Sequence, residues 1–218
     1  VFAVVAQTRD IARKAAQKGK IDVAPITPIL TPDDAVAADT TVLPDYQFRR
    51  GSPETGLQAS KNILSGSMNI GGQEHFYLEG QVAMATPQED NGMLVLSSTQ
   101  HPTEIQHTVA NVLAIPDATV TAEVRRMGGG FGGKESQANQ WAALAALAAR
   151  KTGRTCKIRL DRDDDMIMTG KRHDFKVNWK VGHDDTGLIR AVDLEFLSRC
   201  GYSADLSLGV NDRTMFHA

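Results

Sequence analysis

The glycine-rich stretch between residues 119 and 151 reads TVTAEVRRMGGGFGGKESQANQWAALAALAARK. Its first eight residues alternate β-branched and polar side chains, which predicts a strand. The alanine-rich part that ends near Lys151 predicts a helix. Between them, five of the six residues 128–133 are glycines. Glycine costs roughly 0.5–1 kcal/mol in regular structure and is used where φ is positive or a ligand comes close, so this loop is a candidate site.

The position of this loop before a helix favours an anionic ligand. Backbone N–H groups at a helix N-terminus would face a phosphate-bearing cofactor. Residues 128–134 satisfy the phosphate-binding NTPase pattern G-x-x-x-x-G-K, but Glu135 stands where that pattern needs Ser or Thr. The missing hydroxyl is the Mg²⁺ ligand, and a carboxylate would repel a triphosphate, so the match to an NTPase loop is poor.

A dinucleotide-binding turn is a second interpretation of the same loop. Gly128, Gly130 and Gly133 supply the G-x-G-x-x-G pattern. The strand before them, however, contains Glu123 and Arg125. A strand in a buried parallel sheet is expected to be almost continuously apolar, which weakens this alternative without removing it.

The rest of the chain predicts a mixture of helices and strands. A β-α-β-α unit is expected upstream, with strands at 1–6 and 20–26 and helices at 8–18 and 31–38. Residues 39–55 hold two prolines and no apolar periodicity, which predicts a linker. We therefore place a domain boundary near Ser60.

Downstream of this boundary, short strands surround two helices. Strands are expected at 61–70, 81–86, 93–96 and 157–160, and a helix at 102–113. The acidic run 161–165 predicts a solvated helix start. The alternating runs 173–181 and 188–200 predict an antiparallel pair with one wet face. The fold class is therefore α+β, with a small β-α part over residues 1–60 and a larger α+β part over residues 61–218.

Composition excludes several classes of partner. The 24 basic and 26 acidic residues give a net charge of −2, which offers no basic surface for nucleic acid or an anionic membrane. The longest apolar run, residues 141–149, is shorter than the ~20 residues of a membrane span. Cys156 and Cys200 form neither a disulfide framework nor a metal motif, so we expect a cytoplasmic protein. The opening VFAVVA has no basic leader or initiator Met, so we expect a chain truncated at both ends.

Three motifs occur in order along the chain: GGQEHFYLE at 71–79, SSTQ at 97–100 and RRMGGGFGGKE at 125–135. Together they resemble the molybdopterin domain of the xanthine dehydrogenase family. The segments LDRDDDM at 160–166 and TGKRH at 169–173 resemble it as well. The resemblance implies that residues 1–60 end a small hammerhead-like domain and that residues 61–218 form the first part of the molybdopterin-binding domain.

This resemblance implies a molybdenum–molybdopterin cofactor whose metal is held mainly by the cofactor itself. Gln73 matches the glutamine that hydrogen-bonds the apical oxo group of the metal. Phe131 matches the residue whose backbone lies against the molybdenum centre, and Gly130 and Gly132 beside it permit that approach.

Glu135 matches the glutamate that binds the purine in xanthine-oxidising members of the family. The implied reaction converts hypoxanthine and xanthine to urate, through hydroxide attack at a ring carbon and hydride transfer to a molybdenum-sulfido group. Glu135 would stabilise charge that develops on the ring. Aldehyde-oxidising relatives carry an apolar residue at this position, so an aldehyde-oxidase-like hydroxylase is the alternative.

The resemblance also implies partners. Iron–sulfur clusters and FAD are expected on other chains or missing segments, and the substrate arginine and general-base glutamate are expected beyond residue 218. We therefore expect this chain to be inactive alone. We also expect it to self-associate, because an incomplete domain exposes apolar core residues and unpaired strand edges. The remaining alternative is a non-catalytic α+β interaction module whose glycine loop is only a tight turn.

Overall fold

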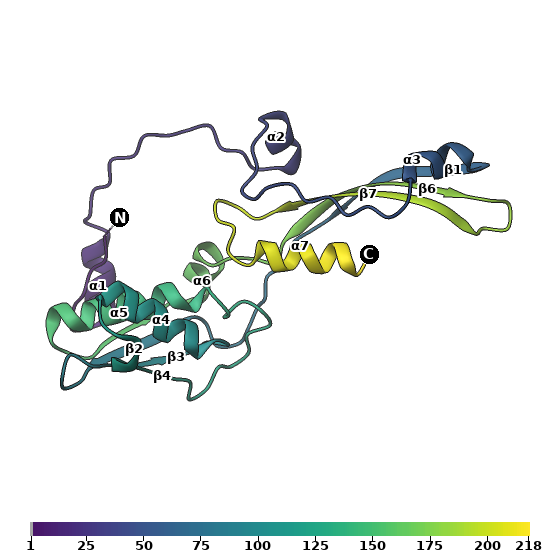
Figure 1. Cartoon of the computed structure of the whole chain (residues 1–218). Helices are drawn as coiled ribbons and strands as arrows, with labels where there is room; N and C mark the ends of the chain where they lie inside the picture. The colour runs from purple at the N-terminus through teal and green to yellow at the C-terminus, as the bar shows by residue number, and fades with distance from the viewer. Residues whose placement is uncertain (1) are drawn as a thin grey trace. The chain divides into compact units, whose positions relative to one another are not determined.

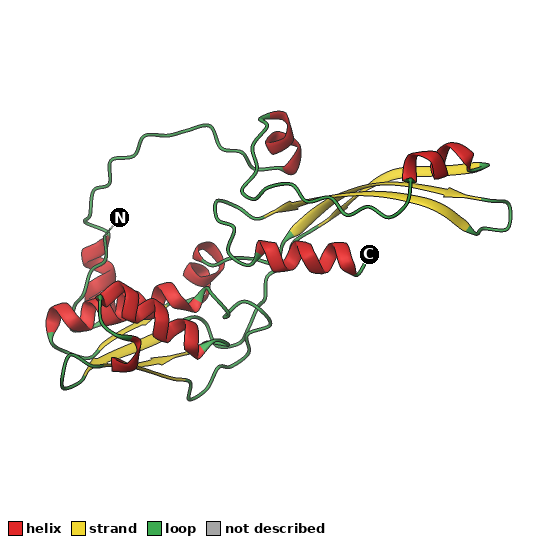
Figure 2. Ribbon diagram, viewed as in Figure 1, coloured by secondary structure: helices red, strands yellow, loops and turns green. Residues whose placement is uncertain are grey.

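The computed structural model describes residues 2–218 (Figures 1 and 2). The helices are α1 (Arg9–Ala16), α2 (Pro32–Ala37), α3 (Pro53–Ala59), α4 (Pro102–Leu113), α5 (Ala138–Thr152), α6 (Arg162–Met168) and α7 (Ser207–Phe216), with a short 3₁₀ helix η1 (Asp117–Thr119). The strands are β1 (Asn62–Ile70), β2 (Val82–Pro87), β3 (Met93–Ser97), β4 (Val120–Glu123), β5 (Cys156–Arg159), β6 (Asp174–His183) and β7 (Ile189–Arg199). This mixture confirms the predicted α+β class.

The chain divides into two compact units that are interleaved in sequence. Unit 1 combines Val1–Ile26 with Glu74–Lys171, and unit 2 combines Thr27–Gln73 with Arg172–Ala218. These units describe which residues contact each other in this chain. The division into domains at about residue 60 remains a prediction.

Unit 1 is built on a four-stranded sheet of order β4-β3-β2-β5, in which β3 and β4 are parallel and the other neighbours are antiparallel. Buried and half-buried residues alternate along β3, as expected of a strand with one covered face. Helices α4 and α5 pack together, and α5 packs on the sheet (Figure 1). The core comprises Ala83, Ala85, Met93, Val95, Ile105, Val109, Ala110, Val120, Ala138, Trp141, Ala142, Ala145, Ala146, Ala149 and Leu160.

Unit 2 contains a three-stranded antiparallel sheet of order β1-β6-β7 (Figure 2). The β6–β7 hairpin confirms the antiparallel pair that the alternating sequence predicts. Residues that pair directly across strands share a face of the sheet. The pairs of one face are largely apolar: Leu64 and Val181, Met68 and Val177, Ile70 and Phe175, Val181 and Val192, Trp179 and Leu194, Val177 and Phe196.

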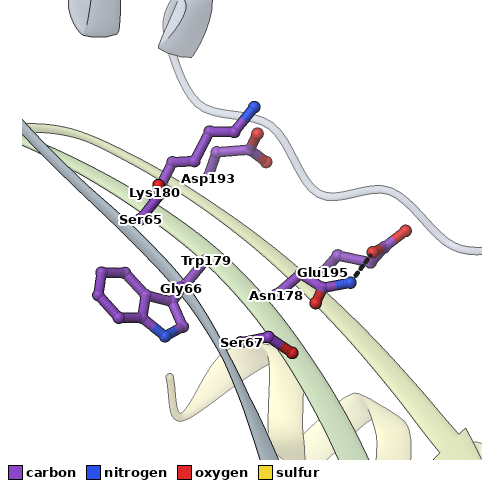
Figure 3. A pocket seen from close by; sticks show the side chains of 8 residues that line it. All are labelled: Ser65, Gly66, Ser67, Asn178, Trp179, Lys180, Asp193 and Glu195. Carbon is purple, nitrogen blue, oxygen red and sulfur yellow. Dashed lines mark hydrogen bonds between the residues drawn. The ribbon is translucent and has the colours of Figure 1, made fainter.

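The opposite face of the same sheet is polar. Its pairs include Ser65 with Lys180, Ser67 with Asn178, Lys180 with Asp193, and Asn178 with Glu195. Figure 3 shows this alternation: Trp179 points to one side of β6, whereas Lys180 beside it points to the other. The sheet therefore has one wet face, as the period-two pattern predicts.

Three of the predicted helices form as expected. Thr8 caps α1 by accepting a hydrogen bond from the Ile11 amide at 3.3 Å, and Thr31 caps α2 by accepting one from the Asp34 amide at 3.1 Å. Helix α4 spans the 12 residues from Pro102 to Leu113 that the apolar periodicity indicates. Local capping and periodicity are sufficient to determine these helices.

Two predicted strands near the start of the chain are absent from the described residues. Residues 2–6 and 20–26 are irregular; residue 1 of the first predicted strand lies outside the described residues. Val23 and Ile26 are strongly exposed. A strand requires a hydrogen-bonded neighbour, and within residues 2–218 no strand pairs with these segments. Helices α3 and α7 were not predicted.

Candidate functional site

The glycine loop, defined as residues 128–133, has an unusual backbone. Gly128, Gly129 and Gly132 have φ values of 61°, 95° and 92°, in the region that favours glycine. Phe131 has a φ of 54°, although a side chain there costs of order 1–3 kcal/mol. Such strain persists only where the surroundings impose it, and it clusters at functional sites.

Close packing explains several of these glycines. A Cβ on Gly128 would overlap Glu79, and a Cβ on Gly130 would overlap the side chain of Gln100. A Cβ on Gly133 would lie 2.7 Å from both His75 and Tyr77. These positions need glycine because the segment before β2 and the segment after β3 both pack closely against the loop.

Gly132 is different, because a Cβ at this position would meet its neighbours only at ordinary van der Waals distance. The nearest atoms to that position are Glu135 Oε1 and His75 Nε2, each 3.8 Å away. Phe131, the preceding residue, is 67% exposed. Phe131 and Gly132 therefore form the open tip of the loop, where a ligand could approach the backbone.

The glycine loop does not lie at a helix N-terminus, contrary to our expectation. Helix α5 begins at Ala138 with Gln137 as its N-cap, five residues after Gly133. The intervening residues form turns, because Lys134 is pulled into the interior of unit 1. A phosphate-binding NTPase loop and a dinucleotide-binding turn both lead directly into a helix, so this geometry removes the support for both alternatives.

The side chain of Gln100 contacts the glycine loop directly. Its Oε1 accepts hydrogen bonds from the Gly132 amide at 2.9 Å and from the Lys134 amide at 3.3 Å. Its own backbone amide donates to the Lys134 carbonyl at 2.8 Å. Gln100 belongs to the SSTQ motif, but it was not among the site residues predicted from the sequence. The available signal was its place just after β3, at the end of the SSTQ motif.

The predicted site residues are divided between the two units. Gly130, Phe131, Gly132 and Glu135 lie together in unit 1, whereas Gln73 is in unit 2. The Oε1 atom of Gln73 accepts a hydrogen bond from Arg172 Nη1 at 2.9 Å, and its carbonyl accepts one from the Arg172 amide at 3.2 Å. The cofactor role of Gln73 remains a prediction.

Glu135 is half-buried and lies outside the first turn of α5. Within residues 2–218, its carboxylate takes part in no hydrogen bond or ion pair. Its position two residues before the N-cap argues against a role as a helix-start acid, because the helix dipole acts within the first turn. The Glu135 carboxylate is therefore available to a ligand at the open tip.

A buried polar network supports the segment behind the glycine loop. The Tyr77 hydroxyl donates to Asp165 Oδ1 at 2.6 Å, and the Gln81 amide donates to Asp165 Oδ2 at 2.7 Å. Burial raises the pKa of Tyr77 to about 12, and the hydrogen bond to Asp165 contributes further. Asp165 is 1% exposed, so our prediction that the acidic run is solvated is wrong at this residue. Its charge is stabilised by these donors.

The donor groups at the open tip suit an organic cofactor that brings its own metal ligands. The tip offers the exposed residue Phe131, the backbone of Gly132 whose amide is held by Gln100, and the Glu135 carboxylate. Within residues 2–218, no three His, Cys, Asp or Glu side chains gather into a group that could hold a metal ion. The exposed tip and the Glu135 carboxylate beside it fit a cofactor whose metal is held by the cofactor's own ligands.

A separate pocket lies on the sheet of unit 2 and is drawn in Figure 3. It is lined by Ser65, Gly66, Ser67, Asn178, Trp179, Lys180, Asp193 and Glu195. The Asn178 side chain donates to Glu195 Oε2 at 2.6 Å, which is drawn as a dashed line. None of the site residues predicted from the sequence lines this pocket.

Comparison with protein families gives a match to the molybdopterin cofactor-binding domain over residues 36–218. The chain is 42% identical over 218 residues to xanthine dehydrogenase/oxidase of Felis catus, and 41% identical over 218 residues to that of Gallus gallus. Each alignment covers 100% of this chain and 16% of the relative, so the chain spans about one sixth of the length of these proteins.

Solved structures with a similar fold include aldehyde oxidoreductase from Desulfovibrio gigas, with a TM-score of 0.82 and 23% identity over 92% of this chain and 23% of that protein. Quinoline 2-oxidoreductase from Pseudomonas putida 86 has a TM-score of 0.74 and 21% identity, over 88% of this chain and 25% of that one. At these identities the likeness concerns the fold.

Proposed function

The chain belongs to the molybdopterin cofactor-binding family, and we propose that it forms the cofactor-facing part of a molybdenum hydroxylase that oxidises purines. Hypoxanthine and xanthine are the proposed substrates and urate the product. The proposal concerns the full-length gene product, because the chain spans 16% of its xanthine dehydrogenase relatives. No helix within residues 2–218 is long and apolar enough to cross a membrane.

The open tip of the glycine loop is the observation that carries this proposal. When bound, molybdenum–molybdopterin would supply the two-electron oxidation that hydroxylates a ring carbon. The backbone of Phe131 and Gly132 would lie against the cofactor, because Phe131 is exposed and a Cβ position on Gly132 has no neighbour closer than 3.8 Å. Gln100 keeps the tip in place through its bond to the Gly132 amide.

Two glutamines are suited to donate hydrogen bonds to oxygen atoms of the cofactor. In each, the side-chain carbonyl is already occupied: Arg172 donates to Gln73 Oε1, and the Gly132 amide donates to Gln100 Oε1. The remaining NH₂ group of each is therefore oriented as a donor. We retain Gln73 as a proposed cofactor residue and add Gln100, which contacts the loop directly.

Glu135 is the proposed substrate residue. Its carboxylate lies beside Gly132 and is not engaged by a protein partner in the described part of the chain. A purine has ring N–H groups that can donate to such an acceptor. A hydrogen bond that strengthens as charge redistributes on the ring would stabilise the transition state.

The electrons removed from the purine must leave the site. We propose that iron–sulfur clusters and FAD accept them, on other chains or on segments outside these 218 residues. A cytoplasmic location completes the proposal and agrees with the free thiols of Cys156 and Cys200.

The test of this function is Glu135→Val in the full-length gene product, assayed with xanthine and with an aromatic aldehyde. We expect turnover of xanthine to fall by about 10²–10³, comparable to the loss of one transition-state donor. Aldehyde turnover should persist or rise, because an aldehyde has no ring N–H for the carboxylate to accept.

The control is Glu123→Gln, which changes an exposed carboxylate of β4 in the same unit. Molybdenum content is measured in every variant, so that loss of cofactor is separated from loss of substrate binding. Unchanged rates with both substrates in a fully metallated Glu135→Val protein would refute the purine assignment. An active protein without molybdenum would refute the hydroxylase itself.

A further inference from the structure

Lys134 follows the glycine loop directly, and its side chain is completely buried. The ammonium group donates to the Met127 carbonyl at 2.6 Å and to Ser98 Oγ at 2.7 Å. It lies 4.6 Å from the centroid of the Tyr77 ring and 4.0 Å from Glu79 Oε2. The groups closest to the ammonium are therefore two acceptors, a π face and a carboxylate.

Burying a charged side chain is costly unless it is fully partnered. The cost is visible here, because burial lowers the pKa of Lys134 to about 8, although the nearby Glu79 and Asp165 act in the opposite direction. An apolar residue of similar volume would fill the same space without this cost. Packing alone therefore does not explain why a charged lysine occupies this position.

The partners of Lys134 supply that reason. Met127 is the residue before the glycine loop and Lys134 is the residue after it, so the bond from Nζ to the Met127 carbonyl joins the two ends of the loop. A second hydrogen bond holds the start of the loop: the Glu79 amide donates to the Gly128 carbonyl at 3.2 Å.

Ser98 links these two contacts. Its hydroxyl accepts from Lys134 and lies 2.8 Å from the Met127 carbonyl and 3.0 Å from Glu79 Oε2. The backbone of Lys134 is also held, because its carbonyl accepts from the Gln100 amide and from Thr99 Oγ1. Both ends of the loop are thus hydrogen-bonded to residues 98–100, which follow β3.

We propose that Lys134 is a positioning residue whose buried ammonium closes the glycine loop at its base and holds Phe131 and Gly132 in the conformation that receives the cofactor. This inference rests on the proposed function for the identity of the ligand. The closure itself is a property of the chain and can be measured without the ligand. Lys134 touches neither substrate nor cofactor in this role.

The test compares Lys134→Met, which keeps the volume and removes the donors, with Lys157→Met, which changes an exposed lysine of β5. Hydrogen exchange is followed by mass spectrometry in the full-length gene product, in peptides that cover the glycine loop and α5. We expect the Gly132 and Lys134 amides to exchange about 10-fold faster in Lys134→Met, because loss of the hydrogen bond to the Met127 carbonyl lowers the free energy of local opening. The α5 peptide should be unchanged.

Retention of the cofactor is the second readout, measured as molybdopterin content after dialysis. We expect Lys134→Met to lose about 10–100-fold in affinity, as supporting partners around a metal site typically do. Ser98→Ala, which removes the shared hydroxyl and keeps the charge, should give a smaller change in the same direction. It also serves as the test variant if Lys134→Met fails to fold.

Loop exchange in Lys134→Met and Ser98→Ala equal to that in Lys157→Met would overturn the closure. Faster loop exchange with undiminished cofactor retention would overturn the positioning role. If the unmodified protein itself carried no molybdopterin, the proposed function would fail, while faster loop exchange in Lys134→Met would still support the closure.

Discussion

The four-stranded sheet of unit 1 and the three-stranded sheet of unit 2 differ in what covers them. All the residues of the buried core lie between Ala83 and Leu160, in unit 1. In unit 2, eight of the nine residues of β1 are exposed, although β1 pairs with β6 along its whole length. Backbone hydrogen bonds can thus define strand pairing without providing a core, and burial provides most of the stability.

The polar residues of the two units differ in the same way. Unit 1 buries the charged side chains of Lys134 and Asp165, each fully partnered. Unit 2 places its ion pairs at the surface, as between Lys61 and Asp185. The glycine loop lies in the unit with the rigid interior, which suits a site that must hold its geometry.

The two tryptophans of the chain provide the largest expected contrast. Trp141 is 4% exposed in the core of unit 1, whereas Trp179 is half-buried on the apolar face of β6. We expect Trp141→Ala to lower the free energy of unfolding by about 3–5 kcal/mol. Trp179→Ala should cost about 1–2 kcal/mol, because it loses less buried area. Urea denaturation followed by circular dichroism measures both, and equal losses would contradict the contrast.

Two aspartates should show an intermediate contrast. Asp165→Asn replaces a buried carboxylate that accepts from Tyr77 and Gln81, and we expect a loss of about 1.5–3 kcal/mol, the range for hydrogen bonds to a charged group. Asp185→Asn weakens an exposed, solvent-screened ion pair with Lys61 and should lower the stability far less. The same denaturation measurement separates them. A larger loss of stability for Asp185→Asn than for Asp165→Asn would show that burial does not determine how much each aspartate contributes.

Self-association is the smallest expected effect and concerns unit 2. Leu64 and Met68, on the apolar face of the sheet, are each more than half exposed. We expect the 218-residue chain to self-associate through this face, and Leu64→Lys to shift it towards the monomer in sedimentation velocity. Ser65→Lys places the same charge on the opposite, polar face and is the matched control. A monomeric unmodified chain at high concentration would contradict this expectation.

Local patterns predicted many of the elements correctly. Capping residues and helical periodicity predicted α1, α2 and α4, short strand-like runs predicted β2 and β3, and alternation predicted the β6–β7 hairpin. The failures share a cause. Strands at residues 2–6 and 20–26 would need a partner strand that pairs with them, and helix propensity alone did not distinguish α3 and α7 from loops.

The glycine loop illustrates the same limit within the site. Its glycines identified it as a candidate, and the resemblance of its motif to a known family is confirmed by the family match. The contacts that explain each glycine come from distant residues: Glu79 beside Gly128, Gln100 beside Gly130, and His75 beside Gly133. Gln100 was overlooked because a single glutamine after a strand has no periodic signal.

The sequence alone determined the α+β class, the positions of the strongly patterned elements, the family and the glycine loop as the candidate site, because these depend on local composition and on motifs. Only the tertiary structure decided that α5 begins five residues after Gly133, that a Cβ on Gly132 would meet no close neighbour, and that Lys134 and Asp165 are buried. Whether a charged side chain is buried depends on the partners that surround it, and those partners come from segments far apart in the chain.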